Sequence, residues 1–230
     1  MREIVLDTET TGLKPEDGHR IIEIGALEMV NHVPTGKTFH IYINPERDIE
    51  ADAISVHGIT NERVAQEPIF AQIVDDFLDF IGSSPLVIHN APFDMGFINA
   101  ELEKCGRPAL PHDRAIDTLV MARRKFPGGQ ASLDALCRKF GIDNSHRDLH
   151  GAMIDTDLLA DVYIELLGGK QPGLSLTAED RATVSAAGAD MVTPGQKTHR
   201  PARPFAVSDD EKKAHQDFID GLNDALWKKL

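Results

Sequence analysis

The ten residues from Ile4 to Leu13 constrain the chain more than any other stretch. Three apolar residues open it and turn-prone residues close it, which predicts a buried strand. Because side chains alternate along a strand, Asp7 and Glu9 point to the same face, about 7 Å apart at the backbone. Like charges at the end of a core strand resist burial, so we expect a hard cation, Mg²⁺ or Mn²⁺, between them. A solvated strand end is the alternative for this pair taken alone.

Length and composition predict one domain with a hydrophobic core and an appendage, since 41% of the 230 residues are hydrophobic. The chain has no apolar run of about 18 residues and no signal-peptide pattern at its start, so we expect no membrane span and no export. Cys105 and Cys137 lie within apolar patterns, and we expect them to be reduced core residues of a cytoplasmic protein.

The net charge of −13 belongs entirely to the first 169 residues, because residues 170–230 hold equal numbers of basic and acidic side chains. A protein that binds nucleic acid unaided usually has the opposite sign. If this chain acts on DNA or RNA, metal ions and a partner protein must help to bring the substrate to it.

Apolar periodicity predicts an α/β domain. Three strands form an antiparallel start to a sheet, with a turn over 31–37 and a further short strand at 86–89. Helices are expected from Pro68 to Gly82, from Pro92 onward, over 117–125, from Ser132 to Gly141 and over 151–167. The second and third strands are expected at 20–30 and 38–43.

Two of the predicted helices carry an aspartate at the head of an otherwise apolar face, Asp94 in one and Asp155 in the other. A lone carboxylate is expensive to bury, so each should meet a cation. Placing both beside Asp7 and Glu9 satisfies all four acids at one site, and four carboxylates suit two Mg²⁺ ions.

His150 precedes Asp155 by five residues, which is about 140° around an ideal helix. The two side chains can therefore meet only if His150 lies in the loop before the helix. A histidine beside a metal site is a candidate general base. A surface histidine at a helix N-terminus is the alternative.

Three motifs in order resemble those of the DEDD exonuclease superfamily: Asp7-Thr-Glu9, His89-Asn-Ala-Pro-Phe-Asp94 and His150-Gly-Ala-Met-Ile-Asp155. The histidine of the third motif marks the DEDDh branch, and the chain resembles the proofreading exonucleases of bacterial replicative polymerases in that branch. The resemblance covers residues 3–168 strongly. Further support comes from Ile22–Gly25, Val56–Ile59, Ser132–Cys137 and Ala160–Tyr163.

The resemblance implies an RNase H-like fold, with a five-stranded mixed sheet flanked by helices. It also implies a 3′–5′ exonuclease that removes mismatched 3′-terminal nucleotides from DNA and releases nucleoside 5′-monophosphates. In the family, two metal ions about 3.5–4 Å apart act on the scissile phosphodiester. The residues assigned by the match are Asp7, Glu9, Asp94 and Asp155 as ligands of Mg²⁺ or Mn²⁺, and His150 as the activator of water.

The resemblance also implies a pocket for the terminal nucleotides. Asp52 stands where close relatives often carry Glu, and the shorter acid should weaken a contact to the 3′-hydroxyl. The pocket residues are Asp7, Glu9, Thr10, Gly12, Leu13, Asp52, His57, Asn90 and Phe93.

Beyond an exonuclease domain of residues 1–169, the composition shifts to Gly, Pro, Ser, Thr and Ala. This shift predicts a flexible linker over 170–207. Near its start, Gln171, Leu174 and Leu176 have the spacing of peptides that dock on bacterial sliding clamps. Ordinary linker is the alternative.

The last segment, residues 208–230, predicts an amphipathic helix that starts at a capping box of Ser208 and Glu211. The resemblance implies that this helix docks on the catalytic (alpha) subunit of the polymerase, and folding back onto the nuclease is the alternative. The sequence leaves open whether a small accessory subunit binds the core. The residues expected at the polymerase contact are Phe218, Ile219, Leu222, Leu226 and Trp227.

Two other functions compete with a replicative proofreader. An RNA-trimming exonuclease of the same superfamily would share every catalytic residue, but it needs no linker and docking segment. A catalytically dead scaffold predicts the loss of a catalytic position, and all five are intact.

Overall fold

The computed structural model describes residues 1–145, 149–169 and 207–221. Its contacts divide the chain into two units, Met1–Gly173 and Leu174–Leu230. No helix in these described ranges is long and apolar enough to cross a bilayer. Several predicted positions lie outside the described residues: Gln171, Leu174, Leu176, Leu222, Leu226 and Trp227, with most of the predicted linker.

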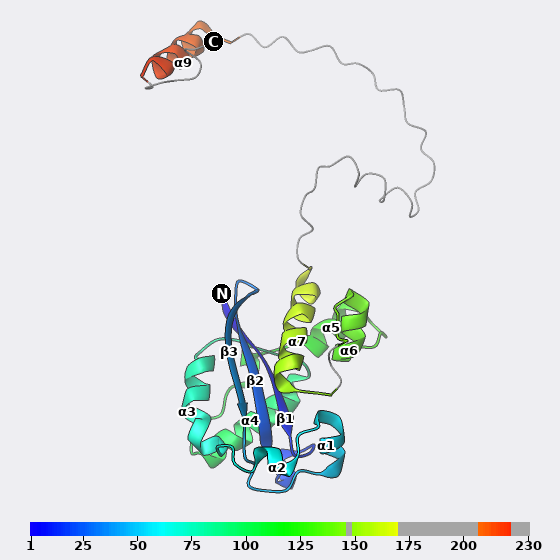
Figure 1. The fold of residues 1–230 in the computed structure, drawn as a ribbon. Helices are drawn as coiled ribbons and strands as arrows, with labels where there is room; N and C mark the ends of the chain where they lie inside the picture. Colours follow the sequence, from blue (N-terminus) through cyan, green and yellow to red (C-terminus); the bar gives the residue numbers. More distant parts are fainter. Residues whose placement is uncertain (146–148, 170–206, 222–230) are drawn as a thin grey trace, which may run out of the picture. The chain divides into compact units, whose positions relative to one another are not determined.

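A five-stranded mixed sheet organises the first unit (Figure 1). Its strands are β1 (Arg2–Thr10), β2 (Ile21–Val30), β3 (Val33–Tyr42), β4 (Leu86–Ile88) and β5 (Ala115–Asp117). Their order is β3-β2-β1-β4-β5, which places β1 in the centre. Strand β2 pairs antiparallel with both β1 and β3, whereas β4 pairs parallel with both β1 and β5. The predicted mixed sheet is therefore confirmed.

Helices cover both faces of this sheet. They are α1 (Ala51–His57), α2 (Asn61–Val64), α3 (Phe70–Ile81), α4 (Ala91–Lys104), α5 (Thr118–Lys125), α6 (Leu133–Phe140) and α7 (Ala152–Leu167). Ile4 and Leu6 of β1 pack with α3 and α4, whereas Val5 packs with α5, α6 and α7 on the other face. Figure 1 shows α3 and α7 on opposite sides of the strands. Alternate residues of the central strand therefore fill two cores.

The turn between β2 and β3 is shorter than the sequence predicted. Val33 already pairs with Val30, so the loop is only Asn31 and His32, both with positive φ. Two left-handed residues make the tight turn whose twist suits a hairpin. Pro34 lies within β3 rather than in a turn, because β3 is an edge strand and can lack a hydrogen-bond donor.

The second unit contains helix α9 (Asp209–Gly221). The predicted capping box is confirmed, because the Glu211 backbone N–H donates to Ser208 Oγ at 3.3 Å and Ser208 N–H donates to the Glu211 carboxylate at 3.0 Å. This helix exposes Phe218 and buries Ile219, both of which belong to the predicted polymerase contact.

Candidate active site

The pairing of β1 with β2 determines what lies beside the two strand acids. Asp7 pairs with Gly25 and Glu9 pairs with Glu23, and paired residues in antiparallel strands share a face. All four positions therefore face α7. A glycine beside Asp7 leaves open space on this face, and α7 occupies it.

Helix α7 approaches β2 at Gly25 at backbone distance. A Cβ atom at this glycine would lie 2.4 Å from the backbone of Ala152, so no side chain fits. Glu23 accepts a hydrogen bond from the Ala152 N–H at 3.1 Å, and Thr156 Oγ1 donates to the Gly25 carbonyl at 3.1 Å. The carboxylate of Glu23 satisfies one of the free N–H groups at the positive end of the helix. These contacts place Asp155, in the first turn of α7, next to β1.

Asp94 reaches the same edge of the sheet from α4. Its Oδ1 accepts hydrogen bonds from the Thr8 backbone N–H at 3.0 Å and from Thr8 Oγ1 at 2.7 Å. The side chain is only 3% exposed, and this burial raises the pKa of Asp94 to about 7. Burial disfavours the charged form more than the Thr8 hydrogen bonds favour it, which a bound cation would reverse.

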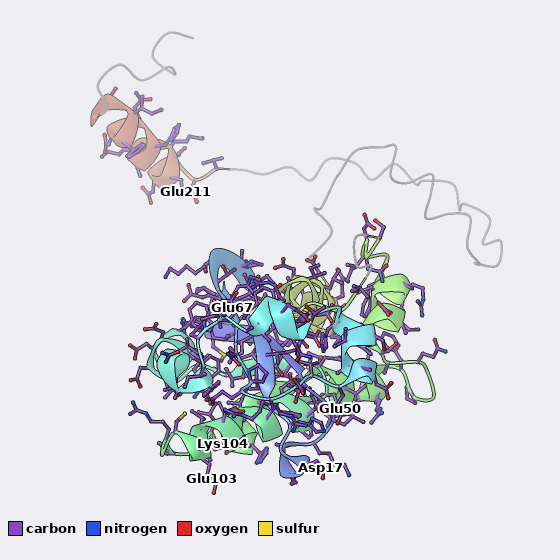
Figure 2. The ribbon with its side chains drawn as sticks, turned by 60° about the horizontal axis from the view of Figure 1, so that its bottom comes forward. Asp17, Glu50, Glu67, Glu103, Lys104 and Glu211 are labelled. Atoms are coloured by element: carbon purple, nitrogen blue, oxygen red, sulfur yellow. The ribbon has the colours of Figure 1, made fainter. Side chains whose placement is uncertain are left out.

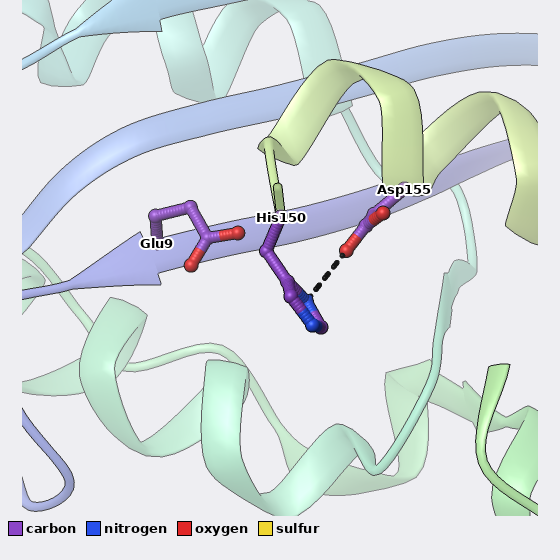
Figure 3. A group of neighbouring side chains, drawn as sticks. All are labelled: Glu9, His150 and Asp155. Atoms are coloured by element: carbon purple, nitrogen blue, oxygen red, sulfur yellow. Dashed lines mark ion pairs between the residues drawn. The ribbon is translucent and has the colours of Figure 1, made fainter. Parts of the chain in front are cut away.

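His150 lies in the loop immediately before α7, as the sequence predicted. Its Nδ1 is 3.2 Å from Asp155 Oδ2. One ligand atom from each of Glu9, His150 and Asp155 lies within 4.8 Å of the others, and Figure 3 shows these three side chains facing a common point. The carboxylate oxygens of Glu9 and Asp155 suit a divalent metal ion, and the imidazole lies beside them.

One cavity of about 480 Å³ collects all five predicted catalytic positions. It lies where the N-terminal ends of α4, α6 and α7 meet the end of β1. The cavity is lined by Asp7, Thr8, Glu9, Leu13, His89, Asn90, Phe93, Asp94, Ser132, Leu133, Asp134, His150 and Asp155.

A second cavity, of about 260 Å³, shares Thr8, Glu9, Leu13 and Phe93 with the first. Every position predicted for the nucleotide pocket lines at least one of the two. In the second cavity these positions are joined by residues of α1 and by Glu50, which Figure 2 labels. Its full lining is Thr8, Glu9, Thr10, Gly12, Leu13, Glu50, Asp52, Ala53, Val56, His57 and Phe93.

His57 is a neutral group in this second cavity. Burial lowers the pKa of His57, so the ring is uncharged near pH 7. Its Nδ1 accepts the Ile59 N–H at 3.0 Å, which leaves the ring proton on Nε2. This Nε2 atom is buried and makes no hydrogen bond within the described part of the chain.

Three residues that support the site were not predicted from the sequence. Glu23 and Gly25 hold the N-terminal end of α7 against β2, as described above. The buried ring of His19 lies against Gly12, where an added Cβ would come within 2.3 Å of it, and its Nδ1 is 3.1 Å from Thr11 Oγ1. The only sequence signal for Glu23 and Gly25 was the resemblance over Ile22–Gly25, which gave no role, and His19 had no such signal.

Comparisons with known proteins agree on one family. The model of the RNase_T exonuclease family matches residues 4–163. The chain is 49% identical over 225 residues to DNA polymerase III subunit epsilon of Rickettsia felis, covering 96% of this chain and 97% of that protein. It is 42% identical over 239 residues to the same subunit of Pasteurella multocida, covering 99% and 94%. The chain belongs to this exonuclease family, among the epsilon subunits of DNA polymerase III.

Solved structures of other exonucleases share the fold. Exonuclease X in complex with 5′ overhanging duplex DNA is 26% identical, with a TM-score of 0.57, over 79% of this chain and 98% of that one. The nuclease domain of 3′hExo, a DEDDh family member bound to rAMP, is 23% identical with a TM-score of 0.63, over 72% and 91%. These structures confirm the predicted RNase H-like fold. The epsilon relatives and the family model confirm the predicted proofreading 3′–5′ exonuclease. The RNA-trimming exonuclease and the inactive scaffold are therefore not favoured.

The raised pKa of Asp94 predicts how metal-free stability depends on pH. Between pH 3.8 and about 7 the folded protein holds a proton that the unfolded chain has released. The free energy of unfolding should therefore fall as pH rises through this window, by up to about 4 kcal/mol. Asp94→Asn keeps the acceptor for Thr8 and should remove most of this fall.

The measurement is urea denaturation in EDTA at pH 5 and pH 8. The exposed acid Asp113 supplies the control variant, Asp113→Asn, which should behave as the native protein. Equal pH dependence in the native chain and in Asp94→Asn would show that Asp94 is ionised in the folded apoprotein.

Proposed function

We propose that this epsilon-family chain hydrolyses the 3′-terminal phosphodiester of DNA with Asp7, Glu9, Asp94, Asp155 and His150. The observation that carries the proposal is their convergence on one cavity from β1, α4, α7 and the loop before α7. The four acids would hold two divalent ions, Mg²⁺ or Mn²⁺. When bound, such ions lower the pKa of the attacking water and stabilise the charge that develops on the phosphate.

His150 is the proposed general base. Its Nδ1 lies beside the Asp155 carboxylate, and a hydrogen bond there fixes the tautomer with a lone pair on Nε2. This lone pair can accept a proton from water in the cavity. The imidazole side chain is 46% exposed, so water reaches it.

The second cavity is the proposed pocket for the terminal nucleotide. It adjoins the catalytic cavity through Glu9, Leu13 and Phe93, so a nucleotide held there places its phosphate at the acids. Its wall combines apolar residues, such as Leu13 and Val56, with polar side chains, a mixture typical of sites that orient a small ligand. The carboxylates of Glu50 and Asp52 in its lining are suited to accept a hydrogen bond from the sugar hydroxyl.

His150→Ala should reduce turnover on a single-stranded 3′ end by about 10²–10⁴-fold, because a general base contributes that much. Mn²⁺ affinity should change little. The pH–rate profile should lose one ionisation, and the exposed His112 gives the matched control, His112→Ala. An unchanged profile in His150→Ala would remove this residue from the chemistry.

The tail is proposed to hold the nuclease at the replication machinery in the cytoplasm. We assign Gln171, Leu174 and Leu176 to the sliding clamp and the segment 208–230 to the polymerase catalytic subunit. A long linker keeps the nuclease at high effective concentration near a moving primer end. A small accessory subunit on the core is compatible with this scheme. The polymerase also compensates for the negative net charge of the nuclease, because the polymerase can hold the DNA that an acidic nuclease would repel.

Deleting residues 208–230 should abolish association with the polymerase catalytic subunit and leave hydrolysis of a free single strand intact. The truncated chain retains residues 171–176, so its binding to the sliding clamp is an internal control and should persist. Co-migration on a sizing column measures both associations. Retained polymerase binding by the truncated chain would place that interface on the nuclease domain.

A further inference from the structure

The loop that carries His150 contacts α1 as well as α7. The His150 backbone N–H donates to the Val56 carbonyl at 3.2 Å. Leu149, one residue earlier, packs on Gly58, because a Cβ atom at Gly58 would lie only 2.5 Å from Leu149 Cδ1. Two consecutive residues of the loop are thus attached to the C-terminal end of α1.

The chemistry of a helix end explains this attachment. The last carbonyls of a helix have no partner within it. At the end of α1, the Gly58 N–H bonds the Ile54 carbonyl at 2.7 Å, and the His150 N–H bonds the Val56 carbonyl. Gly58 has a φ of +72°, which favours glycine, and its lack of a side chain leaves the space that Leu149 fills.

The same helix forms a wall of the proposed nucleotide pocket. Asp52, Ala53, Val56 and His57 all line the second cavity. Val56 therefore lines the proposed nucleotide pocket, and its carbonyl accepts a hydrogen bond from the His150 backbone N–H. On the other side, the His150 ring lies 3.2 Å from Asp155 in α7. His150 is supported from two elements, one of them a wall of the substrate site.

We propose that Leu149 and the C-terminal end of α1 position His150 for proton transfer. Leu149 is a positioning residue, since it acts through its neighbour. It is 50% exposed, so its side chain contributes little to the core. The inference rests on the proposed function of His150 and adds that the nucleotide wall also determines where this base lies.

Leu149→Ala should lower kcat on a single-stranded oligonucleotide by about 10- to 100-fold, because small displacements of a catalytic group have effects of this size. KM should stay within about twofold, since no pocket residue changes. Leu149→Met refills the space over Gly58 with a flexible apolar chain and should restore most of kcat. Leu167 is also a half-exposed leucine, at the far end of α7, and Leu167→Ala should match the native enzyme.

The decisive comparison repeats Leu149→Ala in the His150→Ala background. If Leu149 acts through His150, the second substitution lowers kcat no further. An equal loss in both backgrounds, an unchanged kcat in Leu149→Ala alone, or a loss that Leu149→Met does not reverse overturns the proposal. Unchanged turnover in His150→Ala alone would instead refute the proposed general base, so the two failures are distinguishable.

Discussion

The site depends on the contact of α7 with β2 at Gly25. No side chain fits between this glycine and the backbone of Ala152, so the first turn of α7 lies directly on the sheet. Glu23, two residues earlier, bonds the N-terminal end of the helix. Because Gly25 pairs with Asp7 and Glu23 with Glu9, the contact that seats α7 also brings Asp155 to the strand acids. The contact that packs α7 against the sheet is therefore also the contact that assembles the proposed metal site.

The buried acids of this site lower the stability of the folded protein when no metal is bound. Asp94 and Asp155 are both nearly fully buried, and burial raises the pKa of Asp94. Carboxylates in such surroundings favour a proton or a metal ion over bare charge. The carboxylates that destabilise the apoprotein are therefore the ones expected to bind a cation strongly. Metal binding should then raise the free energy of unfolding.

Much of this arrangement could be predicted from the sequence, because it depends on local patterns. Apolar stripes and caps predicted α3, α6 and α7, and a lone acid on an apolar face singled out Asp94 and Asp155. The helices α1 and α2 and the strand β5 were missed, because elements this short show little periodicity. The role of Glu23 could not be derived either, since its partner Ala152 is 129 positions away in the chain.

The most direct test of this account is a count of bound Mn²⁺ by electron paramagnetic resonance, on the full chain with a nucleoside 5′-monophosphate present. The account predicts about two ions per chain, both displaced by excess Mg²⁺. Asp155→Asn should lose at least one of them while keeping its circular dichroism spectrum, and Asp113→Asn should lose none. A native chain that binds no Mn²⁺, or an Asp155→Asn chain that binds as many ions as the native one, would contradict the central claim that α7 completes a metal site on β1.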